Sequence, residues 1–226
     1  MHYCVGYATS LSPLGPFIKA AENPIVVGDG IYTSGTGHCN VCPSPDGSEL
    51  YMVYHSHSDV TNTENPVADR TPCVDKMVFD AEGKLSVNGP FVVKQPYPSG
   101  TGGLYQRKSG ITVESSFGGD PAFLTDGAIA TERVYRFAGK GSIKLTYSEP
   151  VSLESIWLYS DKDGNAPKSA TLFVNGTHIS AAQTFSAEKP YTPAVFAVGC
   201  TARTVEILLD GGEGACLSEI ITVERK

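Results

Sequence analysis

Three histidines in the first quarter of the chain have the residue type and spacing to do chemistry. His38 lies behind glycines in the stretch GTGH, and His55 and His57 end the run ELYMVYHSH. An imidazole can ligate a metal, act as a general base or stay neutral in a hydrogen bond. Because His55 and His57 are two residues apart, they would share one face of a strand, which permits a common metal ion but is also typical of a solvated strand end.

A catalytic role for His38 lacks partners in the sequence. General-base and nucleophilic catalysis both need a second group within hydrogen-bonding reach, and neither a nucleophile nor a pair of carboxylates accompanies this histidine. The nearby stretch SDVTNTENPVAD does contain Asp59, Glu64 and Asp69, but acids in such stretches are usually solvated. We therefore do not expect His38 to be a catalytic base, although one of these acids could in principle serve as a catalytic carboxylate.

The cysteines do not have the spacing of a structural zinc site. Cys39 and Cys42 form a CxxC pair, but no second pair completes a tetrahedral set. Residues three apart in a strand also point to opposite faces. We expect the four cysteines of the first half to be buried free thiols. Cys200 and Cys216 flank a predicted strand pair, and their spacing leaves a disulfide open.

Composition and charge narrow the class of protein. With 41% apolar and 18% charged residues, the 226-residue chain is expected to fold, and it is long enough for two small domains. Its net charge of −7 is opposite to that of a nucleic-acid-binding surface. No apolar run approaches the roughly 20 residues of a membrane span. The first ten residues resemble a strand rather than a signal peptide.

The elements that must position these residues are strands. No segment before residue 105 has the 3.6-residue period of a helix. A Pro- and Gly-rich stretch near residues 96–110 precedes longer alternating strands, so we predict two all-β domains, residues 1–104 and 105–226. Turn signals separate the strands at Pro45-Asp46-Gly47, Glu82-Gly83, Asn88-Gly89 and Asn175-Gly176.

Five motifs of the first half occur in a consistent order: VGYATSLSPLGPF (5–17), NPI (23–25), GTGH (35–38), SPDGSELYMVYHSH (44–57) and DKMVFDAEGKLSVNGP (75–90). Together they resemble the C-terminal part of the five-bladed β-propeller of glycoside hydrolase family 43, which includes arabinosidases, xylosidases and arabinanases. The resemblance implies about two propeller blades. It also implies inverting hydrolysis of arabinose- or xylose-containing plant polysaccharides, with a plant cell-wall oligo- or polysaccharide as partner.

The family's catalytic groups are an Asp base, a second Asp and a Glu acid, and an inverting pair stands roughly 6.5–9.5 Å apart. The resemblance places all three before Met1, so this chain is expected to hold none of them. Activity would then need an upstream propeller segment or association of chains into a homo-oligomer. The resemblance further implies a secreted or periplasmic protein, whereas the chain itself leaves the localisation open.

The resemblance also gives His38 and Arg70 possible roles. In the family, the GTGH histidine lies near the propeller axis and helps to bind a central cation, usually calcium and often through water. In the other interpretation, His38 is a loop residue bonded to backbone. The family's arginine before the DKM strand bonds a sugar hydroxyl, and Arg70 matches it. Its fork of donors suits vicinal hydroxyls, but a surface loop arginine is an equal alternative.

The second half is similar to galactose-binding-like jelly rolls of the discoidin type, a β-sandwich class of carbohydrate-binding module. The similarity rests on LTDG (124–127), SLESIWLYS (152–160) and ACLSEI (215–220). It implies that Asp126 and Glu219 hold a structural calcium ion, although calcium needs six to eight oxygen ligands in all.

Sugar binding in the second half would need an exposed aromatic platform, for which Tyr135, Tyr191 and Trp157 are the candidates. We expect Trp157 to lie in the core, because it falls in an alternating strand. A non-catalytic carbohydrate-binding protein is therefore the alternative to the hydrolase.

Overall fold

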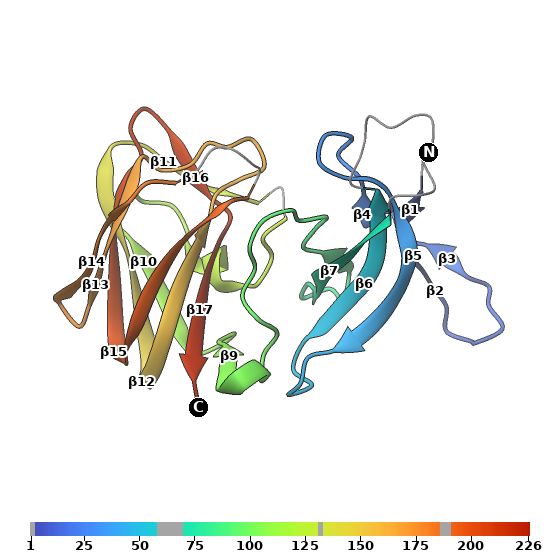
Figure 1. The fold of residues 1–226 in the computed structure, drawn as a ribbon, viewed down its shortest axis with the longest axis horizontal. Helices are drawn as coiled ribbons and strands as arrows, with labels where there is room; N and C mark the ends of the chain where they lie inside the picture. The colour runs from blue at the N-terminus through green and yellow to red at the C-terminus, as the bar shows by residue number, and fades with distance from the viewer. Residues whose placement is uncertain (1–2, 58–69, 131–132, 186–190) are drawn as a thin grey trace. The chain divides into compact units, whose positions relative to one another are not determined.

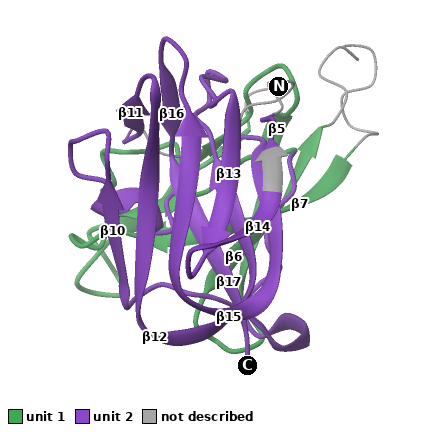
Figure 2. Cartoon of the chain, turned by 90° about the vertical axis from the view of Figure 1, so that its left-hand side faces the viewer, with its two compact units in different colours: residues 1–92 green, residues 93–226 purple. Residues whose placement is uncertain are grey.

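The computed structural model describes residues 3–57, 70–130, 133–185 and 191–226. The described chain is all-β, as predicted, and consists of two compact units, residues 1–92 and 93–226 (Figures 1 and 2). The sequence placed the boundary after residue 104. Residues 93–104 group with the second unit, where strand β9 (Leu104–Gln106) pairs with β17 (Glu219–Arg225). No described residue belongs to a helix long and apolar enough to cross a membrane.

The first unit is built around a four-stranded antiparallel sheet in the order β5-β6-β7-β8. The hairpin between β5 and β6 closes over the predicted Pro-Asp-Gly turn, where the Gly47 amide donates to the Ser44 carbonyl at 2.9 Å. The predicted turn at Glu82-Gly83 joins β7 to β8. A sheet of this kind is the repeating element of a β-propeller. The strands are β5 (Ser34–Pro43), β6 (Leu50–His57), β7 (Arg70–Phe79) and β8 (Leu85–Val87).

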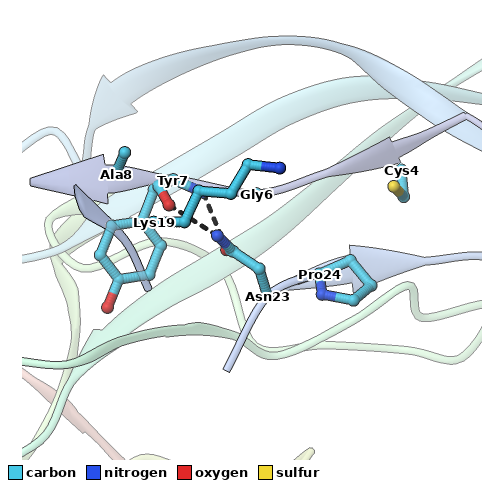
Figure 3. A pocket seen from close by; sticks show the side chains of 7 residues that line it. All are labelled: Cys4, Gly6, Tyr7, Ala8, Lys19, Asn23 and Pro24. Atoms are coloured by element: carbon cyan, nitrogen blue, oxygen red, sulfur yellow. Dashed lines mark hydrogen bonds between the residues drawn. The ribbon is translucent and has the colours of Figure 1, made fainter. Parts of the chain in front are cut away.

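Two short ladders complete the first unit: β1 (Cys4–Val5) with β4 (Val26–Val27), and β2 (Ala8–Thr9) with β3 (Ile18–Lys19). The sequence predicted one strand where β1 and β2 lie. The strand is interrupted because the Asn23 side chain takes the place of a strand partner. Its oxygen accepts the Tyr7 amide at 2.9 Å and its nitrogen donates to the Tyr7 carbonyl at 2.6 Å (Figure 3).

The core of the first unit is small and encloses a buried polar group. Val26, Met52, Tyr54, Met77 and Val87 form its buried apolar cluster. The hydroxyl of Tyr54 donates to the buried carboxylate of Asp75, which also accepts the amide of Phe91. Burial, followed by the Asp75 charge, raises the pKa of Tyr54 well above its usual value, so the phenol stays protonated.

The second unit is a β-sandwich built on two long strands, β12 and β15, which pair with each other along most of their length. Register shifts in this pair, between Thr146 and Val151 and between Leu153 and Ser155, mark the irregularities at which such strands bend. The sheet order is β14-β13-β15-β12-β17-β9, with β10 also on β12. The remaining elements are β10 (Ile111–Ser115), β11 (Tyr135–Phe137), β12 (Lys140–Tyr159), β13 (Ser169–Val174), β14 (Thr177–Gln183), β15 (Pro193–Asp210) and β16 (Ala215–Leu217), with two 3-10 turns, η1 (Thr101–Gly103) and η2 (Ala122–Thr125).

Alternation along β12 determines which side chains form this core. Ile143, Leu145, Ile156 and Leu158 are fully buried in one apolar cluster. Trp157 follows Ile156 and so points to the other face, where it is half-buried and donates its indole N–H to the Ser155 hydroxyl at 3.0 Å. The expectation that Trp157 belongs to the core was therefore wrong.

Candidate functional site

Four of the residues singled out in the sequence gather at one end of the first unit's sheet. There β5 and β7 begin and β6 ends. His57 pairs with Ser34 on one side and with Arg70 on the other, and His55 pairs with Gly37, next to His38. Directly paired residues of antiparallel strands share a face, with Cβ atoms about 4.5–5.5 Å apart. We call His38, His55, His57 and Arg70 the histidine–arginine cluster.

The rings of this cluster lie close together. The ring centroids of His55 and His57 are 5.7 Å apart and nearly perpendicular, and those of His38 and His55 are 6.4 Å apart. Tyr3 packs edge-on against His55 at 6.1 Å. The spacing of His55 and His57 predicted that these two would share a face, but nothing in the sequence indicated that Tyr3 would join them.

Glycine at position 35 makes room for the cluster. Its φ is +55°, and a Cβ there would lie 2.6 Å from Cδ2 of His57. The group that approaches Gly35 so closely is therefore the His57 ring. His38 has a φ of +53°, a left-handed conformation that is uncommon for a residue with a side chain. It turns the chain where the register of β5 on β6 shifts, between Gly37 and Asn40.

The cluster is only partly open to solvent. Arg70 and His38 are exposed and His55 is half-buried, whereas His57 has an exposed fraction of only 5%. The Nε2 atoms of His55 and His57 are buried and have no hydrogen-bond partner among the described residues. Burial, followed by the charges of Arg70, His57 and His38, lowers the pKa of His55 below its usual value.

These groups can bind a ligand, but they do not form an acid–base pair for glycoside hydrolysis. A guanidinium offers five donors and no acceptor, and a neutral imidazole offers one of each. Glycoside hydrolysis needs two carboxyl groups, and the four side chains of the cluster provide none. Asp59, Glu64 and Asp69, the acids of the intervening stretch, lie outside the described residues.

The predicted cation at His38 is not tested by the structure. Among the described residues, no group of three or more His, Cys, Asp or Glu side chains is placed to hold a metal ion. The shared metal considered for His55 and His57 would therefore need further ligands. The ring of His38 is exposed and lies 6.4 Å from that of His55. Because calcium prefers oxygen ligands, a cation that acts through water remains the form of this prediction.

The structure brings the predicted calcium residues of the second unit close together. The carboxylate of Glu219 is buried, with an exposed fraction of 1% for the residue, and accepts the amide of Gly127 at 3.0 Å. Asp126 accepts the amide of Ala128 at 2.9 Å and pairs with Arg133 at 2.7 Å. Both carboxylates already have partners, so calcium at this loop remains a prediction.

The aromatic platform proposed from the sequence is not formed by Tyr135, because this side chain is buried and its hydroxyl bonds to Ser115 and to the Gly118 carbonyl. Tyr191 is half-buried, with a φ of +57°. Tyr97 is the most exposed large aromatic of the second unit's described residues, at 68%. It was missed because it lies between prolines in a stretch interpreted as linker.

Two surface hollows were not predicted. One, of about 560 Å³, lies in the first unit against β1, β2 and β3 and is lined by Tyr7, Lys19 and Asn23, with the exposed thiol of Cys4 (Figure 3). The other, of about 440 Å³, lies in the second unit and is lined by Ser116, Lys140, Gly141, Ser142, Ser169, Thr171, Leu208, Leu209 and Asp210.

The cysteines are all free, so the disulfide considered for Cys200 and Cys216 is not formed. Cys4, Cys39 and Cys42 are exposed, which corrects the expectation that the cysteines of the first half are buried. Cys39 and Cys42 follow His38 on β5, which pairs within its sheet only with β6. An edge strand has a neighbouring strand on one side only, so its side chains have fewer neighbours to cover them.

The fold and site together define the first unit as a propeller-type sheet with a polar cluster at one end. Residues 1–85 match the family model of Glycosyl hydrolases family 43. A solved structure, a thermostable family-43 glycoside hydrolase, is 44% identical over 42% of this chain and 30% of that chain, with a TM-score of 0.39. The chain thus spans less than a third of that protein. No curated protein matches the chain.

Other solved structures are similar to about half of the chain. The family 32 CBM from C. perfringens NanJ in complex with galactose is 16% identical over 52% of this chain and 96% of that chain, with a TM-score of 0.44. The C-terminal domain of a chitobiase from Bacteroides fragilis is 17% identical over 52% of this chain and 95% of that chain, with a TM-score of 0.42. Likeness at this level says nothing about what this chain binds.

Proposed function

We propose that this chain is part of a carbohydrate-active protein of the family 43 type, in which a propeller-type first unit precedes a sugar-binding sandwich. The observation that carries the proposal is the match of residues 1–85 to the family 43 model. The reaction would be inverting hydrolysis of arabinose- or xylose-containing plant polysaccharides. A secreted or periplasmic location would fit such a substrate.

In this proposal the chain's residues bind and position the saccharide and do not transfer protons. Arg70 is exposed and opposite His57, so its fork of donors is available to vicinal hydroxyls. His55 lies two residues before His57 on β6, and its ring centroid is 6.4 Å from that of His38. The catalytic acid and base would come from polypeptide outside these residues, either an upstream propeller segment or another chain.

The alternative is a non-catalytic carbohydrate-binding protein. The observation that favours it is the composition of the histidine–arginine cluster, which contains donors but no carboxyl group. In this case the saccharide would bind to the sandwich, and the first unit would serve as a scaffold.

Hydrolysis of aryl-arabinosides and aryl-xylosides by the chain alone tests where the catalytic groups lie. An acid or base commonly contributes 10²–10⁴-fold, so we expect turnover far below the roughly 1–10³ s⁻¹ of ordinary enzymes. Turnover within that range, abolished by mutating an acid of this chain, would overturn the assignment. Glu64 and Asp69 are the first acids to mutate.

The genomic sequence upstream of Met1 separates the two candidate functions. A continuing reading frame that encodes an Asp, Asp and Glu set at propeller spacing supports the hydrolase. A start codon at Met1 with no such frame supports the binding protein, or a hydrolase completed by a second chain.

A further inference from the structure

The histidine–arginine cluster contains a fixed positive charge, Arg70, in a chain whose net charge is −7. Arg70 is always charged at physiological pH. Among the described residues, the neighbours that lower the pKa of His55 through their charges are basic side chains, Arg70 first, and none of them is an acid. A neutral sugar would leave this charge uncompensated, whereas an anionic group would be attracted to it.

The cluster also contains buried ring nitrogens that need a partner. Buried polar atoms are nearly always hydrogen-bonded, because an unsatisfied one loses its hydration without replacement. The Nε2 atoms of His55 and His57 are buried and have no hydrogen-bond partner among the described residues. The whole His57 residue has an exposed fraction of only 5%. A neutral imidazole has one N–H donor, so a ring that carries its hydrogen on Nε2 would be a donor without an acceptor.

We propose that the histidine–arginine cluster binds the carboxylate of an acidic sugar of the uronic acid class. A carboxylate is acceptor-only and matches the guanidinium fork of Arg70 with two parallel hydrogen bonds. The imidazoles of His38 and His55, whose ring centroids are 6.4 Å apart in the same cluster, donate to the carboxylate or to the adjacent hydroxyls.

The inference rests on the proposed function, because that proposal identifies the ligand as a saccharide. The charge of Arg70 is the reason to expect a carboxylate on it. The exposed positions of Arg70 and His38 leave the cluster open on the ligand's side. The buried ring of His57 packs over Gly35 and forms the inner side of the cluster.

Calorimetric titration of the full chain with methyl glucuronide and with methyl glucoside tests this directly. The two ligands differ only at C6, which is a carboxylate in the glucuronide and a hydroxymethyl group in the glucoside. Tighter binding of the glucuronide therefore reports recognition of the carboxylate. We expect Arg70→Gln to weaken glucuronide binding about 10- to 100-fold, the usual range for a hydrogen bond to a charged group. Arg70→Lys keeps the charge without the fork and should lose less.

Arg203→Gln is the matched control, because Arg203 is an exposed arginine of the second unit and its loss changes the net charge equally. If Arg70→Gln and Arg203→Gln weaken glucuronide binding equally, the preference for glucuronide reflects only the overall charge of the chain, and the proposed site is overturned. Equal binding of glucuronide and glucoside would overturn it too. If acetate displaces glucuronide at matched concentration, the cluster recognises a carboxylate without its sugar, and the uronic acid class is wrong.

A second ligand keeps this inference separate from the proposed function. If a neutral arabinoxylan oligosaccharide binds, but the chain does not prefer glucuronide to glucoside, only the carboxylate site is overturned. Failure of every saccharide to bind overturns both. Circular dichroism of each variant establishes that it is folded, which is expected because Arg70 and Arg203 are exposed.

Discussion

At the scale of single residues, the cluster depends on what Gly35 lacks. The ring of His57 occupies the place where a Cβ would lie, and the φ of +55° is one that side chains disfavour. The stretch GTGH was therefore a sound sequence signal for close packing. The identity of the packed group could not be predicted, because it depends on the register shift between Ser34 and Gly37.

Replacing Gly35 with Ala should destabilise the first unit by about 2–4 kcal/mol, combining a left-handed backbone penalty with displacement of His57. Gly30→Ala is the control, since Gly30 also has a positive φ of +72° but nothing within 4 Å of a Cβ. It should cost only the backbone term of about 1–2 kcal/mol. Urea unfolding measures both, and equal losses would show that the His57 contact carries no energy.

Removal of calcium should lower the unfolding temperature if Glu219 or His38 holds the ion, because a ligand of the native state stabilises it by mass action. Calorimetry with and without chelator measures the shift in the wild type, His38→Ala and Glu219→Ala. The readout is the chelator-dependent difference, since Glu219→Ala also removes a buried bond to Gly127. An unchanged wild type contradicts both calcium predictions. A shift lost only in Glu219→Ala leaves His38 without a role in calcium binding.

At the scale of elements, local turn signals were reliable only where no tertiary contact competed with them. Asn175-Gly176 forms the predicted hairpin turn, with Val174 paired to Thr177. Asn88-Gly89 was predicted to do the same, and this was wrong. The Asn88 amide donates to the Lys76 carbonyl, and a Cβ on Gly89 would lie 2.2 Å from the Asp75 carboxylate. Here glycine serves packing, which the dipeptide alone does not reveal.

The long strands β12 and β15 supply most of the buried apolar side chains of the second unit. Leu158→Ala on β12 removes a side chain with an exposed fraction of 0% and should cost about 2–5 kcal/mol. Leu208→Ala on β15 is the matched control, because Leu208 is 41% exposed, and it should cost less than about 1 kcal/mol. Chemical denaturation followed by tryptophan fluorescence reports this unit, which contains the single tryptophan, Trp157. Similar losses for the two variants would contradict the assignment of this core.

At the scale of the whole chain, the first unit is less well covered than the second. Its core cluster has five buried apolar side chains, whereas its surface carries many exposed ones. Large exposed apolar areas usually mark a binding surface. The resemblance implied an incomplete propeller, but the sequence could not locate the exposed apolar side chains, which include Leu11, Leu14, Phe17, Ile18, Val74 and Phe79.

We expect these side chains to bring chains together in solution. Light scattering should give a mass above the 23.9 kDa of one chain, and a Leu14→Ser, Ile18→Ser double variant should shift the mass towards that of the monomer. Ser substitution at Leu208, in the second unit, should leave the mass unchanged. A wild-type monomer that neither associates nor aggregates would contradict the prediction.

Both proposed functions, the hydrolase and the binding protein, require that this chain recognises a plant cell-wall saccharide. Affinity electrophoresis of the full chain tests it most directly, in native gels that contain arabinoxylan, arabinan or no polysaccharide. We expect the mobility of the wild type to be reduced in at least one polysaccharide gel, and to be reduced more than that of Arg70→Gln. Unchanged mobility in every polysaccharide gel, for a chain shown to be folded, would contradict it.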